Sequence, residues 1–155
     1  MANSDKRIIF EADDGRIAIM LPTDNCGLTL EQIRAKDVPS GKTSYVVDKS
    51  VIPTDLSFRD AWTYTSGEIS EIGIDMAKAK EIHKSFIRAA REPKLAELDI
   101  QFQIAQETGA SITTIVANKQ ALRDAPAAVG ITTAANATEL KAQWDTSLLG
   151  KSPYS

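Results

Sequence analysis

A chain of 155 residues, of which 43% are hydrophobic and 25% charged, has the size and composition of a globular protein with one or two small units. Its formal net charge of −3 argues against general affinity for nucleic acid. No apolar run approaches the roughly 20 residues that cross a bilayer, and the first residues, MANSDKR, lack the apolar segment of a signal peptide, so we expect a soluble protein that stays off membranes.

The first 72 residues have the pattern of a β-rich unit. Residues 7–12 and 16–21 are strand-like runs, and the short segment between them ends in Asp14 and Gly15. Because Asp-Gly favours a tight turn with positive φ, this segment predicts a β-hairpin.

One short helix is predicted within this unit. Thr29 and Gln32 have the spacing of a capping box, in which each side chain binds the backbone amide of the other residue. The helix should end before Pro39, and the residues at 44–47 and 51–52 return to strand character.

The end of the unit is less regular. Phe58 and Trp62 are four residues apart, so one helical turn would place both rings against the sheet, with Trp62 as a core anchor. Residues 63–74 alternate only weakly, which leaves open a second hairpin or an irregular linker.

The second unit, residues 73–155, is organised around a helical hairpin between Asp75 and Ala125. Its first helix has an apolar stripe with basic residues beside it, and Asp75 is a candidate cap. Pro93 predicts a kink or a break, because proline lacks the amide that an interior helical residue donates. The stripe contains Met76, Ala79, Ile82, His83, Phe86, Ile87 and Ala90, and the basic residues are Lys80, Lys84, Arg88 and Arg91.

After Pro93 the helix has two apolar faces. Leu98 and Phe102 lie on one side, whereas Ile100 and Ile104 fall roughly opposite, as does Ala96. Two antiparallel helices need one face each, so Ile100 and Ile104 require a cover from the rest of the chain or from another subunit. We therefore predict that this segment binds a partner, with Lys84, Arg88 and Arg91 as further candidate contacts.

The return helix should begin soon after Gly109, which favours the left-handed conformation that ends a helix. The predicted inward face of this helix contains Ile112, Ile115, Val116 and Leu122. A last short helix follows the capping-box spacing of Asn136 and Glu139, with Leu140 and Trp144 as its apolar edge. We expect the tail, residues 151–155, to fray unless a neighbour holds it.

Residues with catalytic chemistry are sparse. His83 is the single histidine and lies on the apolar stripe, so we expect a hydrogen-bonded core or boundary role. Cys26 is the single cysteine, so no internal disulfide is possible. A nucleophilic thiol would need a nearby base, and the only imidazole lies in a distant segment; burial of Cys26 is the favoured interpretation.

The acidic residues do not form a metal site in the sequence. Asp13 and Asp14 should serve the turn, and Asp24 with Asn25 lacks the further oxygen ligands of a calcium loop. No phosphate-binding glycine loop, serine elbow or zinc spacing is present. We expect no enzymatic activity and no cofactor.

Several segments resemble small proteins of tailed bacteriophages and prophages. The similarity spans about residues 8–98, and its more specific pieces are ADDGRIAI, LTLEQIRAKDVP, FRDAW and DMAKAKEIH. The resemblance implies a gene among tail and tail-fibre genes and a protein that is built into the virion or needed to assemble it. In some short-tailed phages a similar small protein joins the fibres to the tail. The family supplies no catalytic residues to carry over.

The sequence thus predicts an α+β protein, with a β-rich N-terminal unit followed by a helical hairpin and a short C-terminal helix. The leading functional hypothesis is a non-enzymatic adaptor between tail fibres and tail, present in several symmetric copies in the virion tail and in the host cytoplasm during assembly. A tail-fibre assembly chaperone and a head decoration or completion protein are the alternatives.

Overall fold

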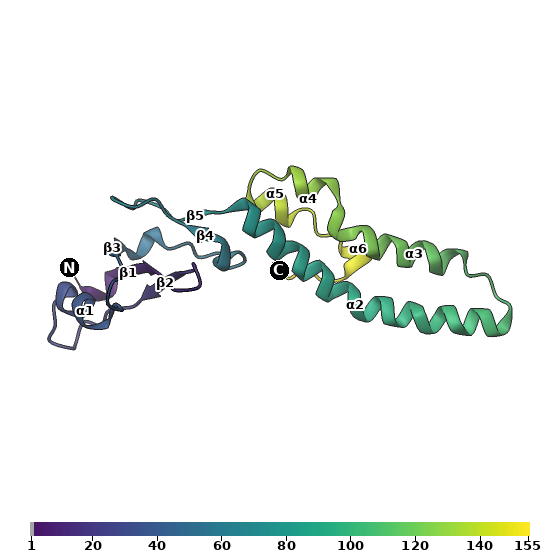
Figure 1. Ribbon diagram of the computed structural model, residues 1–155, viewed down its shortest axis with the longest axis horizontal. Coiled ribbons are helices and arrows are strands. Elements are labelled where there is room, and N and C mark those ends of the chain that lie inside the picture. Colours follow the sequence, from purple (N-terminus) through teal and green to yellow (C-terminus); the bar gives the residue numbers. More distant parts are fainter. Residues whose placement is uncertain (1) are drawn as a thin grey trace. The chain divides into compact units, whose positions relative to one another are not determined.

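Strands occupy the first half of the chain and the long helices the second, which confirms the predicted α+β class (Figure 1). The structure is a computed structural model that describes residues 2–155. The chain divides into two compact units, residues 1–75 and 76–155. The observed boundary follows residue 75 rather than residue 72, because the last strand of the first unit, β5 (Gly73–Ile74), pairs back within that unit.

Three antiparallel strands form the main sheet of the first unit. β1 (Lys6–Glu11) lies between β2 (Ile17–Met20) and β3 (Ser44–Asp48). The predicted hairpin between β1 and β2 is confirmed. Gly15 has a φ of +78° in the turn, a conformation that glycine adopts without steric cost.

The apolar core of this unit lies on one face of the sheet. Ile9 of β1 is opposite Ile19 on β2 and Tyr45 on β3, so these three side chains share that face. The buried members of the core are Ile9, Ile17, Val47 and Trp62, and the side chains packed around them are Ile19, Tyr45, Val51, Ile52, Tyr64, Ile69, Ile72 and Ile74. The prediction that Trp62 is a core anchor is confirmed.

The other face of the sheet carries Ile8, which is fully buried, and Ser44. α1 (Leu30–Asp37) is bound to this side through Arg34. Its Nε donates to Ser44 Oγ and its Nη2 donates to the Ser44 carbonyl, both at 2.7 Å. The sheet therefore has an apolar core on one face and a tethered helix on the other.

Of two further sequence predictions in this unit, one is confirmed and the other is wrong in part. The capping box is confirmed: Thr29 Oγ1 accepts from the Gln32 amide at 3.2 Å, and Gln32 Oε1 accepts from the Thr29 amide at 2.8 Å. The expected extended segment at 51–52 is wrong in part, because a 3₁₀ turn, η2 (Lys49–Val51), covers its first residue.

Two further single 3₁₀ turns and a second hairpin complete the unit. η1 (Asn3–Asp5) precedes β1, and η3 (Arg59–Ala61) leads into β4 (Trp62–Thr63). β4 pairs with β5, so the segment that the sequence left open is a hairpin with a long loop. Phe58, just before η3, is 2% exposed.

The second unit begins with α2 (Met76–Thr108), a single helix of 33 residues that contains Pro93. Of the predicted kink or break at this proline, the break is excluded, because the helix continues through it; Figure 1 shows α2 changing direction part-way along its length. Gly109, with a φ of +70°, follows the last helical residue. α3 (Thr113–Asp124) then returns along α2, which confirms the hairpin.

Short helices close the chain. They are η4 (Ala125–Ala127), α4 (Val129–Thr133), α5 (Ala137–Lys141) and α6 (Thr146–Leu149), of which the sequence predicted only α5, the helix that Asn136 caps. α5 and α6 both contact α2. Their buried side chains, together with those of α2, form the core of this unit.

The expected fraying of the C-terminal tail is wrong. Tyr154 packs on the aromatic side chains of His83, Phe86 and Trp144, with ring centroids 5.7–6.3 Å apart. Its hydroxyl lies 2.6 Å from His83 Nδ1. The neighbour that holds the tail is therefore the chain's own α2.

Candidate partner interface

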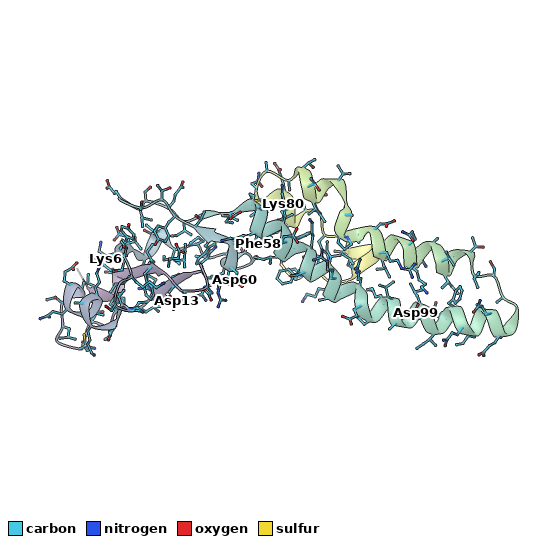
Figure 2. The ribbon with its side chains drawn as sticks, viewed as in Figure 1. Lys6, Asp13, Phe58, Asp60, Lys80 and Asp99 are labelled. Carbon is cyan, nitrogen blue, oxygen red and sulfur yellow. The ribbon has the colours of Figure 1, made fainter. Side chains whose placement is uncertain are left out.

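The half of the hairpin next to the loop between α2 and α3, which we call the far half, is held together by contacts between one face of each helix. Asp99, which lies on that half of α2 (Figure 2), forms an ion pair with Lys119 of α3. The same ammonium group sits 5.1 Å from the centroid of the Phe102 ring. Ala105 and Leu122 are buried. These contacts fix which side of α2 faces α3.

Ile100 and Ile104 lie away from that side. They are 59% and 53% exposed, respectively, so no other segment of the second unit seals them. They are one helical turn apart and therefore lie side by side. Because most exposed positions of a helix are polar, two neighbouring exposed isoleucines are a candidate docking surface.

A shallow groove lies on α2 on the N-terminal side of these isoleucines. Its volume is about 450 Å³, and its lining consists of Arg88, Arg91, Glu92, Leu95, Ala96 and Asp99. Ala96 is one helical turn before Ile100, so the groove leads towards the exposed isoleucines. We call the groove and the two isoleucines together the distal surface.

The three basic candidates have different environments. Lys84 forms an ion pair with Glu81 at 2.8 Å, and this contact holds the pKa of Glu81 below its ordinary value. Arg88 is exposed and lines the groove. Arg91 also lines the groove, but its Nη1 donates to the carbonyls of Leu122 (3.2 Å) and Arg123 (2.8 Å).

Arg91 therefore has a structural role that the sequence did not predict. Leu122 and Arg123 lie in the last turn of α3, where carbonyl groups lack helical partners and the helix dipole is negative. The guanidinium of Arg91, on the neighbouring helix, donates to these carbonyls and supplies the positive charge that the negative end of the dipole favours. The arginine was visible in the sequence, but the register that brings it to the end of α3 was not.

Val116 is a correction to the predicted inward face of α3. Its side chain is 46% exposed, whereas Leu122 is 2% exposed. On a helix, Val116 is rotated by about 100° from Ile115 and by about 120° from Leu122, which places it at the edge of the inward face. Val129, 76% exposed, is a further apolar side chain on the surface of this unit.

His83 has the core role that the sequence predicted. It is fully buried, and burial lowers its pKa because the charged imidazolium would lose its hydration. Burial likewise raises the pKa of Tyr154, which contacts His83 Nδ1. His83 Nε2 meets no hydrogen-bond partner among residues 2–155. This ring stabilises the attachment of the tail and is sealed from solvent.

The expected burial of Cys26 is wrong. The thiol is exposed, and its Sγ lies 3.4 Å from the Thr23 carbonyl. Cys26 precedes Gly27, whose φ is +70°, in a turn that passes over the surface. Its position in the first unit separates it in sequence from His83 in the second.

Of the two carboxylates predicted to serve the first turn, Asp14 does so and Asp13 does not. Asp14 accepts from the backbone amide of Arg16 at 3.0 Å and from its Nε at 2.8 Å, which lowers the pKa of Asp14. Asp13 pairs instead with Lys42 at 2.6 Å. Within residues 2–155 there is no cluster of three or more histidine, cysteine, aspartate or glutamate side chains suited to a metal ion.

No protein-family model, curated protein or solved structure matches this chain. In the part of the chain that the structure describes, none of the helices has the length and apolarity needed to cross a bilayer. The case for function therefore depends on the surfaces of the molecule itself and on the phage-like segments of its sequence.

Proposed function

We propose that this chain is a non-enzymatic structural protein of a tailed-phage virion, an adaptor that joins tail fibres to the tail. The observation that carries the proposal is the pair of exposed isoleucines on the far half of the hairpin, Ile100 and Ile104. An adaptor must present apolar surface that only its partner covers. The segments that resemble phage proteins indicate the kind of partner, which is a tail or tail-fibre protein.

The anatomy of the distal surface is consistent with a protein partner. Its apolar part is rimmed by charged side chains, Arg88 and Glu92 among them, and such a rim is typical of protein–protein interfaces. The hairpin that carries the surface is braced by Arg91 and by the Asp99–Lys119 ion pair, so the apolar side chains are held in place before binding.

The direct test is the protein content of purified particles of a phage that encodes this chain. Quantitative mass spectrometry should find the chain in a fixed ratio to the tail proteins. Its absence from mature particles, combined with its presence in infected cells, would contradict the adaptor proposal and favour an assembly chaperone that leaves after the fibre has folded.

The location of the chain within the particle distinguishes the adaptor from a head decoration or completion protein. Heads and tails can be prepared separately and each probed for the chain. The adaptor should be recovered with tails. Recovery with tailless heads would contradict the adaptor proposal and identify a head decoration or completion protein.

A further inference from the structure

The outer side of β3 is a sheet edge, at which Arg34 Nη2 donates to the Ser44 carbonyl at 2.7 Å. In the order β2-β1-β3, the strand pairs with β1 on one side, and no strand of residues 2–155 pairs with it on the other. The opposite edge is different, because η3 lies beside β2, where Asp60 forms an ion pair with Arg16 at 3.3 Å. An open edge presents backbone donors and acceptors that another strand can bind.

β3 has one guard against strand pairing, the contact of Arg34 with Ser44 at its first residue, and lacks two others. Its sequence, SYVVD, contains neither proline nor lysine and is rich in residues that favour strands. A groove of about 710 Å³ lies beside it, and its lining includes residues 43–48 and 67–70.

The charges that line this groove are self-complementary. Asp48, 61% exposed, pairs with Lys6 at 2.6 Å at one end of β3. Arg34 binds Ser44 at the other end and lies 3.5 Å from Glu31. Each end of the strand therefore carries one acid and one base, and the antiparallel approach of a second copy can exchange these ion pairs for pairs between copies.

We propose that β3 pairs antiparallel with β3 of a second copy, around a two-fold axis that passes through Val46. Val46 is the midpoint of Ser44–Asp48, so this register pairs every residue of the strand, and a register centred elsewhere leaves strand residues unpaired. The two sheets become one continuous sheet. The proposal concerns the first unit and holds whether or not the chain is an adaptor.

The register brings opposite charges together. Asp48 of one copy lies opposite Ser44 of the other, and both side chains are on the face that carries Arg34. The carboxylate then meets the guanidinium, and the Lys6 of its own copy approaches Glu31 of the other. The two-fold axis repeats this contact. On the opposite face, Tyr45 lies opposite Val47 of the second copy, and both side chains belong to the apolar core of their own units.

Cysteine cross-linking tests the register. Because Cys26 is the only native cysteine, a C26S background allows a single thiol to be placed at will. The V46C variant should form a covalent dimer on oxidation, since a residue on the two-fold axis lies opposite the same residue of the second copy. A18C, on the guarded β2 edge, is the matched control and should stay monomeric.

Sedimentation equilibrium tests the pairing without a cross-link. The C26S chain should dimerise, and D48K should raise the dissociation constant at least about tenfold by placing two cations together. D60K is the control, because it too removes an exposed ion pair but lies beside β2, and it should leave the constant unchanged. Combining the I100D/I104D substitutions with each of these chains distinguishes pairing through β3 from association through the distal surface.

A chain that stays monomeric throughout the accessible concentration range would overturn the proposal. So would V46C cross-linking no faster than A18C, or dimers that D48K and D60K affect equally. Dimers that are lost only in I100D/I104D would also overturn it, because they would form through the second unit instead. None of these results depends on whether the chain is found in virions.

Discussion

At the scale of single residues, the most constrained group is His83. Its ring is buried against Tyr154 and Trp144, with one nitrogen bound to the tyrosine hydroxyl. Because burial disfavours the imidazolium, the folded protein holds this side chain neutral at a pH where the unfolded chain would protonate it. Proton binding and tail attachment are thereby coupled.

The second unit should lose stability as the pH falls below about 6.5. The folded pKa of His83 lies below the unfolded value, so the unfolded state binds the extra proton. The destabilisation begins near the unfolded pKa and grows until the pH reaches the lower folded pKa. Denaturant unfolding between about pH 5 and 7 should show this slope in the native chain and not in H83Q, since the chain has no other histidine. An equal slope in H83Q would contradict the assignment.

The tyrosine hydroxyl should contribute measurably to the same unit. Y154F removes the 2.6 Å contact with His83 and should lower the free energy of unfolding by about 1 to 3 kcal/mol, because it leaves a buried nitrogen without its partner. Y154A should cost more, since the stacked ring is also lost. K151A, at an exposed position of the same tail, is the control; a loss in K151A equal to that in Y154F would count against the tyrosine contact.

At the scale of elements, Arg91 ties α2 to the end of α3. R91A should destabilise the hairpin by about 1 to 2 kcal/mol, because it removes two hydrogen bonds from a charged donor to terminal carbonyls. R88A removes an exposed arginine one turn earlier and should change stability by less than about 0.5 kcal/mol. Chemical denaturation measures both variants. Equal effects would show that Arg91 acts only as surface charge.

Element ends were largely predictable because their physics is local. The turn at Gly15, the capping box of Thr29 and Gln32, and the helix end at Gly109 each involve residues within four positions of one another. Pro93 shows how far such reasoning goes. Local chemistry predicted a kink or a break without choosing between them, and the helix is continuous through the proline, so the break is excluded.

Long-range contacts could not be predicted in the same way. Tyr154 and His83 are separated by 71 residues, and the tail that carries the tyrosine has no periodicity that would reveal its docking site. The β4–β5 pairing was one of two open alternatives for the same reason. In the candidate interface, the exposure of Ile100 and Ile104 followed from helical geometry, whereas the contact of Arg91 with α3 depended on the pairing of two helices.

At the scale of the whole molecule, the two units have separate surfaces for association. The first presents the open edge of β3, and the second presents the distal surface with Ile100 and Ile104. An adaptor needs contacts with its own copies and contacts with a different protein. Assigning the edge to self-pairing and the distal surface to the partner gives each unit one task, and each task can be disrupted independently.

The distal surface should be dispensable for folding and essential for assembly. I100D/I104D replaces two side chains that are more than half exposed, so the variant should keep the circular dichroism spectrum and nearly the unfolding midpoint of the native chain. A117D/A121D places the same two charges one turn apart on exposed positions of α3 and is the matched control. A collapse of the helical spectrum in I100D/I104D alone would contradict a surface role.

The most direct measurement is the incorporation of these two variants into phage particles that lack the native chain. Each variant is supplied during infection, and the chain present per purified particle is quantified by mass spectrometry. The account predicts that A117D/A121D enters particles as the native chain does and that I100D/I104D is excluded. Normal incorporation of the folded I100D/I104D variant would contradict it.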